Sequence, residues 1–261
     1  MSAVAPIERD GGRLVLARYL EPLAPYLADN TLTEIVINRP GEVFVEGPEG
    51  WTRHELAALT QTYLSHLATA AASYTRQDIG PEYPVVSTSL LGEERCQIVV
   101  PPAVPVGMTS LTIRKPSTLT MNLDALERAK LFDEVRSAGD ELTADEHRLL
   151  ALKEGGHWRE FLELAVSTRR NILISGATGS GKTTLSKALI AAIPPNERLI
   201  TIEDTAELVI PHQNCVRLLY AKDGQGVARI GPRELLESSL RMRPDRILLQ
   251  ELRDGTAFFY L

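Results

Sequence analysis

The sequence predicts two domains: an α+β domain with an antiparallel sheet, then an α/β domain with parallel strands. In the first part, β-branched strand patterns cluster together instead of alternating with helices. In the second part, a glycine-rich loop separates an apolar run from a breaker-free helical segment, which is typical of a strand-loop-helix unit. At 261 residues we expect the first domain over 1–116, a linker over 117–140 and the second domain over 141–261.

The first domain is expected to open with a helix and continue with short strands. Leucines at roughly helical spacing predict an amphipathic helix over Leu14–Leu27. Thr33–Asn38 and Glu42–Glu46 flank Arg39-Pro40-Gly41, whose proline and glycine favour the turn of a hairpin. Leu56–Tyr74 is rich in Ala and Leu and contains no helix breaker. Further strands are expected over Pro84–Leu90, Arg95–Val100 and Met108–Arg114.

After Arg114, the run Lys115-Pro116-Ser117 opens a polar, helix-compatible stretch that we assign to the linker. Thr143 with Glu146 has the spacing of a capping box and predicts a helix start. In Pro232–Met242, leucines 235, 236 and 240 predict one apolar helix face. The other elements expected in the second domain are helices over Trp158–Thr168 and Thr183–Ile193 and strands over Asn171–Ser175, Leu199–Ile202 and Ile247–Leu249.

Composition excludes several classes of function. The formal net charge of -6 provides no global basic field, so direct binding of nucleic acid is not expected. Cys96 and Cys215 are far apart, which indicates neither a disulfide framework nor a zinc site. No stretch approaches the roughly 20 apolar residues of a membrane span, and the N-terminus lacks a signal-peptide pattern. We therefore expect a cytoplasmic protein without an integral membrane segment.

The strongest motif is Gly176-Ala177-Thr178-Gly179-Ser180-Gly181-Lys182-Thr183, which satisfies the full G-x-x-x-x-G-K-[ST] pattern. Glycines allow the backbone to curl so that N–H groups point inward, and the following helix adds its positive N-terminal end. Lys182 would contact the β and γ phosphates and the Thr183 hydroxyl would ligate Mg²⁺, with Thr184 also in the binding set. The alternative is a chance glycine turn with an exposed lysine. The motif predicts a site for a nucleoside triphosphate.

Two apolar runs end in carboxylates. Glu251 follows Arg246–Gln250, which resembles a Walker B strand, and is the candidate general base. The alternative is a core strand that ends in a solvated glutamate. Glu203 ends a second apolar run and would orient water or metal, although exposed acids often follow strands. Arg241 and Arg243 are either solvated charges or partners for a neighbouring subunit's γ phosphate.

These segments together resemble a known family. Ile202–Leu208 followed by Ser239–Leu249 is similar to the secretion-ATPase superfamily, in particular the hexameric traffic ATPases of type IV secretion systems. Leu111–Ser117 resembles the end of that family's N-terminal domain, so the resemblance covers nearly the whole chain. It implies an N-terminal α+β domain, a RecA-like ATPase domain, Mg-ATP as ligand and a ring of like subunits.

The resemblance also assigns residues. Arg114 matches the N-domain arginine that reaches the nucleotide phosphates, with Arg95 a weaker candidate, and Glu203 and Glu251 take catalytic and metal-binding roles. Gln250 stands where the family usually has a small residue, and Asp254 where it has a glycine. The chain reaches Leu261 before the family's histidine box, so we expect it to be C-terminally incomplete. His212 is expected at the surface or in a loop.

The function implied is an ATP-hydrolysing motor, peripheral at the inner membrane, that acts with secretion-channel components to export proteins or protein-DNA conjugates. A nucleotide-binding but catalytically silent module with an assembly or regulatory role is the alternative. A P-loop kinase, GTPase or helicase is disfavoured, because the sequence has no guanine-selecting Asn-Lys-x-Asp pattern and its charge gives little support for a DNA track.

Overall fold

The computed structural model describes residues 7–117, 121–133, 135, 141–222 and 225–252, and the chain divides into two compact units. The first unit comprises Met1–Pro116, Asn196–Glu207 and His212–Leu261, and the second comprises Ser117–Pro195 and Leu208–Pro211. The N-terminal segment of the first unit thus ends at Pro116, where the linker was predicted to begin. The same unit also contains strands from the C-terminal part of the chain. The domain boundaries drawn from sequence stay a prediction.

A six-stranded sheet forms the first part of the first unit, with strand order β3-β2-β1-β6-β5-β4. Every neighbouring pair is antiparallel, which confirms the predicted sheet. The edge strand β3 was not predicted, because its residues are mostly polar and partly exposed and show no apolar alternation. The strands are β1 (Glu34–Ile37), β2 (Glu42–Gly47), β3 (Gly50–Glu55), β4 (Val85–Ser89), β5 (Arg95–Val99) and β6 (Ser110–Arg114).

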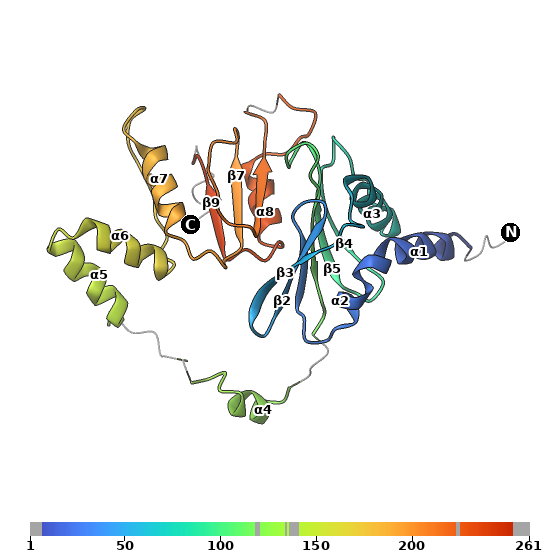
Figure 1. Ribbon diagram of the computed structural model, residues 1–261, viewed down its shortest axis with the longest axis horizontal. Helices are drawn as coiled ribbons and strands as arrows, with labels where there is room; N and C mark the ends of the chain where they lie inside the picture. The colour runs from blue at the N-terminus through green and yellow to red at the C-terminus, as the bar shows by residue number, and fades with distance from the viewer. Residues whose placement is uncertain (1–6, 118–120, 134, 136–140, 223–224, 253–261) are drawn as a thin grey trace, which may run out of the picture. The chain divides into compact units, whose positions relative to one another are not determined.

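Helices α1 (Ile7–Leu20) and α3 (Gln61–Tyr74) cover one face of this sheet (Figure 1). The predicted first helix is confirmed, but it begins earlier and is followed by a 3₁₀ turn, η1 (Glu21–Leu23), and a short α2 (Ala24–Ala28). Pro22 and Pro25 explain this division, because proline has no N–H and disrupts a helix interior. The core beneath the helices includes Leu16, Leu23, Ile35, Ile37, Leu64, Leu67, Ile98 and Ile113.

The C-terminal strands of the same unit form a second, parallel sheet of order β8-β7-β9. Strands β7 (Leu199–Glu203) and β9 (Arg246–Leu249) confirm the predicted parallel strands, whereas β8 (Cys215–Leu219) was not predicted. Helix α8 (Pro232–Ser239) packs against β7. Its predicted apolar face holds for two of the three leucines; Leu240 follows the helix and is 68% exposed, so that part of the prediction was wrong. The shared core includes Val99, Val104, Ile200, Ile202, Leu218, Leu235 and Met242.

Polar contacts join the second face of the antiparallel sheet to these C-terminal segments. The guanidinium of Arg198 is fully buried (0% exposed) and donates to Oδ1 of Asn38 at 2.7 Å and to Oδ1 of Asn214 at 2.5 Å. The Gln97 amide donates to the Ser238 hydroxyl at 2.9 Å. Buried polar groups require such partners, so these contacts specify how the two sheets meet.

The described part of the second unit is helical. Its elements are α4 (Leu123–Arg128), α5 (Ala144–Glu154), α6 (Trp158–Ser167) and α7 (Lys182–Ala191). The predicted capping box is present, since Thr143 and Glu146 exchange hydrogen bonds at the start of α5. The strand predicted over Asn171–Ser175 is not formed: no strand of its own unit lies beside it in the described structure, and an apolar run alone does not make a hydrogen-bonded ladder.

Two further expectations can be compared with the structure. His212 lies in a loop, as the second of its two predicted settings has it, and it is only 7% exposed. Asp254, the second departure from the family pattern, lies outside the described residues. Within the described ranges, no helix is both long and apolar enough to cross a bilayer.

Candidate functional site

The glycine-rich loop of the second unit curls around the ammonium group of Lys182. Its Nζ donates to the carbonyl oxygens of Gly176 and Ala177, both at 2.8 Å. Gly179 and Gly181 have φ values of +79° and +88°, which are in the left-handed region that glycine adopts without a steric penalty. Gly181 is also the N-cap of α7, so the loop leads directly into the first turn of that helix.

This loop has the properties of an oxyanion cradle. The first N–H groups of a helix have no intrahelical acceptor, and the helix end carries a partial positive charge. Thr183 and Thr184 lie exposed in the first turn of α7, and the residues from Gly176 to Gly181 are exposed as well. A Cβ added to Gly176 would lie 2.5 Å from the Ser180 hydroxyl oxygen, so a larger residue would crowd the loop. Exposed backbone amides at the start of a helix, an ammonium group and a hydroxyl on one loop fit a phosphate group and its counterion.

Glu203, in the other unit, ends β7 and is fully buried (0% exposed). Its Oε1 accepts a hydrogen bond from the Thr201 hydroxyl at 2.6 Å and lies 3.1 Å from Nε of Arg217. Its Oε2 accepts from the backbone N–H of Glu207 at 2.9 Å. Both carboxylate oxygens therefore already have protein partners.

Glu251 follows β9, and β9 is the parallel neighbour of β7, so the carboxyl ends of both strands lie at one sheet edge. Gln250 connects the ends of β9 and β7. Its backbone N–H donates to the Ile202 carbonyl at 3.1 Å. Its side-chain amide donates to Oε2 of Glu207 at 3.0 Å. The structure thus gathers Glu203, Glu207 and Gln250, with Glu251 next in sequence. The Gln250 side chain, which departs from the family pattern, is directed at this acidic segment.

The predicted arginines line a pocket of about 730 Å³ within the first unit. Arg114 and Arg95 face each other across β6 and β5, and Arg114 faces Glu34 across β6 and β1. The Arg114 Nε lies 3.6 Å from Oε1 of Glu34. We call the group Glu34, Arg95, Arg114, Arg241 and Arg243 the arginine pocket.

Sequence reasoning identified the four arginines separately but missed Glu34. Burial raises the pKa of Glu34 to about 7, against the lowering effect of Arg114. A glutamate in a strand pattern carries no sign of this environment. Only the β1–β6 register could have revealed it.

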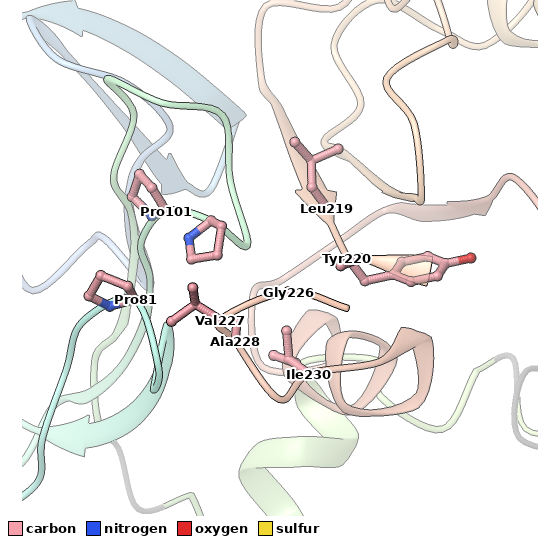
Figure 2. A pocket seen from close by; sticks show the side chains of 10 residues that line it. Pro81, Pro101, Leu219, Tyr220, Gly226, Val227, Ala228 and Ile230 are labelled. Atoms are coloured by element: carbon pink, nitrogen blue, oxygen red, sulfur yellow. The ribbon is translucent and has the colours of Figure 1, made fainter. Parts of the chain in front are cut away.

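A second pocket of the first unit, of about 330 Å³, has an almost entirely apolar lining (Figure 2). Pro81 and Pro101 lie on one side and Leu219 and Tyr220 on the other, with Val227 drawn between them and nearer the prolines. None of the described residues that line it carries a charge that would recognise a phosphate, so the nucleotide site is sought elsewhere.

Comparison with known proteins identifies the family of this chain. Residues 145–258 match the family described as type II/IV secretion system protein. The type IV secretion system protein VirB11 of Bartonella quintana (strain Toulouse) is 53% identical over 253 residues, covering 93% of this chain and 71% of that protein. The protein of the same name from Brucella suis biovar 1 (strain 1330) is 47% identical over 247 residues, covering 93% and 68%.

A solved structure extends the similarity to the fold. The crystal structure of the VirB11 ATPase from the Brucella suis type IV secretion system, in complex with sulphate, matches with a TM-score of 0.91 at 44% identity, covering 98% of this chain and 74% of that chain. Similarity at this level over nearly the whole chain shows a shared two-domain ATPase fold. The chain therefore belongs to the VirB11 group of the type II/IV secretion system protein family.

Proposed function

We propose that this chain is an ATP-hydrolysing motor subunit that energises type IV secretion and that it holds the nucleotide phosphates in the loop from Gly176 to Thr183. One observation carries the proposal: two left-handed glycines curl the loop around the Lys182 ammonium at the start of α7. The related ATPase crystallised with sulphate supports an oxyanion site in the family. We further propose that residues 141–261 form a RecA-like ATPase domain.

The loop residues bind and orient the phosphates. Lys182 exchanges its two carbonyl acceptors for β- and γ-phosphate oxygens, to which a charge-assisted hydrogen bond is stronger. Backbone N–H groups of the loop and of the first turn of α7 would donate to the remaining phosphate oxygens. Mg²⁺, when bound, neutralises charge on the phosphates, and the exposed Thr183 hydroxyl is the loop group that fits it.

The carboxylates and arginines act on water and on the transferred phosphoryl group. Glu251 accepts a proton from the attacking water, which makes it the general base. Glu203 would support the metal site, and because both its oxygens already have protein partners it suits orientation of a water better than direct ligation of the ion. Arg114 supplies positive charge to the phosphoryl oxygens, as arginine does in phosphoryl transfer.

We also propose the wider assembly. Like subunits form a ring, which the resemblance to the family implies is a hexamer, at the cytoplasmic face of the inner membrane. There the ring works with inner-membrane components of the secretion channel, and no direct contact with nucleic acid is required. Sedimentation of the purified chain with and without Mg-ATP tests whether it assembles.

The test of the nucleotide site compares three variants. Lys182→Ala removes a hydrogen-bonded positive charge, worth about 1.5–3 kcal/mol, so Mg-ADP affinity measured by calorimetry should fall by about 10- to 100-fold. Lys187→Ala is the matched control, because this lysine is exposed on the same helix. Glu251→Gln should keep the affinity and lose phosphate release. Unchanged affinity in the Lys182→Ala protein would reject the loop as the site.

Phosphate release separates the motor from a silent binding module. Release from the native chain that exceeds release from the Lys182→Ala protein supports hydrolysis. Equal release from both, with nucleotide binding intact in the native chain, would support the assembly or regulatory alternative instead.

A further inference from the structure

A row of four charged residues crosses the antiparallel sheet. In the strand registers Glu46 faces Glu34, Glu34 faces Arg114, and Arg114 faces Arg95. Directly opposed residues of neighbouring strands point to the same face of a sheet. The row therefore runs acid, acid, base, base over strands β2, β1, β6 and β5, and its last three members line the arginine pocket.

The two acids of this row differ in how well their charges are balanced. Glu46 is bound by Arg243 through two hydrogen bonds, one of them from Nε at 2.9 Å. Glu34 is 4% exposed, and its ion pair with Arg114 spans 3.6 Å, longer than the roughly 2.7–2.9 Å of a charge-assisted hydrogen bond. Its Oε2 is buried without a hydrogen-bond partner among the described residues. A buried, incompletely bonded carboxylate is costly to keep ionised.

The charged groups around Glu34 come from every side. Burial is the main cause of its raised pKa of about 7, Glu46 on β2 raises it further, and Arg114, Arg243 and Arg198 lower it. Its carboxyl group therefore gains and loses a proton near neutral pH. Arg114, in contrast, leaves 71% of its side chain exposed, so its guanidinium can also pair with a group that enters the pocket.

Resting on the proposed role of Arg114, we propose that Glu34 is a positioning residue that holds Arg114 by ion pairing and releases it to a phosphate or sulfate oxyanion when Glu34 is protonated. An ionised Glu34 competes with the oxyanion for the Arg114 guanidinium, and its negative charge also repels the oxyanion. A neutral Glu34 does neither. Binding of the oxyanion at Arg114 is thus coupled to uptake of one proton.

The expected size of the coupling follows from the fraction of neutral Glu34. With a pKa of about 7, about nine tenths of the molecules carry neutral Glu34 at pH 6 and about one tenth at pH 8. If only the neutral form binds, the apparent dissociation constant scales inversely with this fraction. Affinity at Arg114 should then weaken about tenfold between these pH values.

Sulfate is the probe, because it keeps its charge across this range whereas the terminal phosphate of a nucleotide does not. The readout is the side-chain Nε–H resonance of Arg114 in the full chain, assigned by its loss in Arg114→Lys. Sulfate is titrated at pH 6 and pH 8 into the native protein, Glu34→Gln and the control Glu55→Gln, whose side chain is 83% exposed on the same sheet. The local readout excludes sulfate bound at the glycine-rich loop.

The native protein and Glu55→Gln should lose about tenfold in affinity from pH 6 to pH 8, and Glu34→Gln should bind equally at both pH values with the stronger affinity. A Glu34→Gln protein that keeps the native pH dependence would overturn the proposal, as would an Arg114 resonance that sulfate leaves unmoved at both pH values. A purely structural Glu34 would change thermal stability without changing this profile.

A measurement on the native chain alone covers the case that the variant does not fold. Coupling is reciprocal, so saturating sulfate should raise the midpoint at which the labelled δ-carbon of Glu34 titrates. A midpoint that stays in place would count against the proposal. Loss of nucleotide binding in Lys182→Ala tests the other unit, so the proposed function and the Glu34 inference can fail independently.

Discussion

Replacing Arg198 by methionine would remove the charged group that joins the two sheets of the first unit while filling much of the same volume. The Arg198 guanidinium is fully buried, and burial lowers its pKa only to about 10, so it is charged at neutral pH. It donates to the side-chain oxygens of Asn38 and Asn214 and, through Nε, to the Met242 carbonyl at 2.9 Å. All three acceptors would lose this donor, as would the Thr112 hydroxyl oxygen, which accepts from Nη2 at the longer distance of 3.4 Å.

The losses at Asn38, Asn214 and Met242 are unequal. Asn214 keeps a second donor, because Nδ2 of Asn38 lies 3.0 Å from its Oδ1. The Asn38 oxygen and the Met242 carbonyl would remain as unsatisfied buried acceptors, at about 1–3 kcal/mol each. Removing a buried charge relieves part of that cost. We therefore expect Arg198→Met to lower the free energy of unfolding of the first unit by about 3 kcal/mol.

Urea unfolding followed by tryptophan fluorescence measures this change. Trp51 lies in the first unit and Trp158 in the second, so a Trp158→Phe background confines the signal to the first unit. Arg233→Met is the control, because Arg233 forms an exposed pair with Glu237 one helical turn away and such pairs contribute little. A midpoint for Arg198→Met that matches the control would refute the reasoning that this network joins the sheets.

Two further predictions concern the loop and the buried acid. Gly181→Ala places a side chain at φ +88°, which costs about 1–2 kcal/mol and should weaken Mg-ADP binding measured by calorimetry. The control Gly11→Ala, in helix α1, should leave the binding unchanged. Equal affinities of the two variants would show that the left-handed turn is dispensable. The folded-state pKa of Glu34, about 7, lies above its ordinary value of 4.5, so the folded state holds the proton more tightly and stability falls as pH rises between these values. Between pH 5.5 and pH 8 the free energy of unfolding of the native protein, measured in urea, should fall by about 2 kcal/mol more than that of Glu34→Gln. Parallel dependence of the two free energies on pH would contradict this prediction.

Local chemistry explains which predictions from sequence succeeded. The capping box of Thr143 and Glu146 and the hairpin from Glu34 to Gly47 depend on residues close together in the chain, and both are present. The loop that encloses Lys182 is likewise a contiguous segment, whose glycines permit the left-handed turns that it needs. The strand expected over Asn171–Ser175 is the counterexample, because a strand also requires a partner that periodicity does not identify.

By itself, then, the sequence determined the glycine-rich loop, the capped start of α5 and the antiparallel character of the first sheet, because each depends on neighbours along the chain. Tertiary structure alone decided that Glu34 lies opposite Arg114 and that Arg198 is buried against Asn38, 160 positions away. The physical reason is that strand register and buried hydrogen bonds are set by pairing of distant segments, whose side chains carry no local signal of the partner they meet.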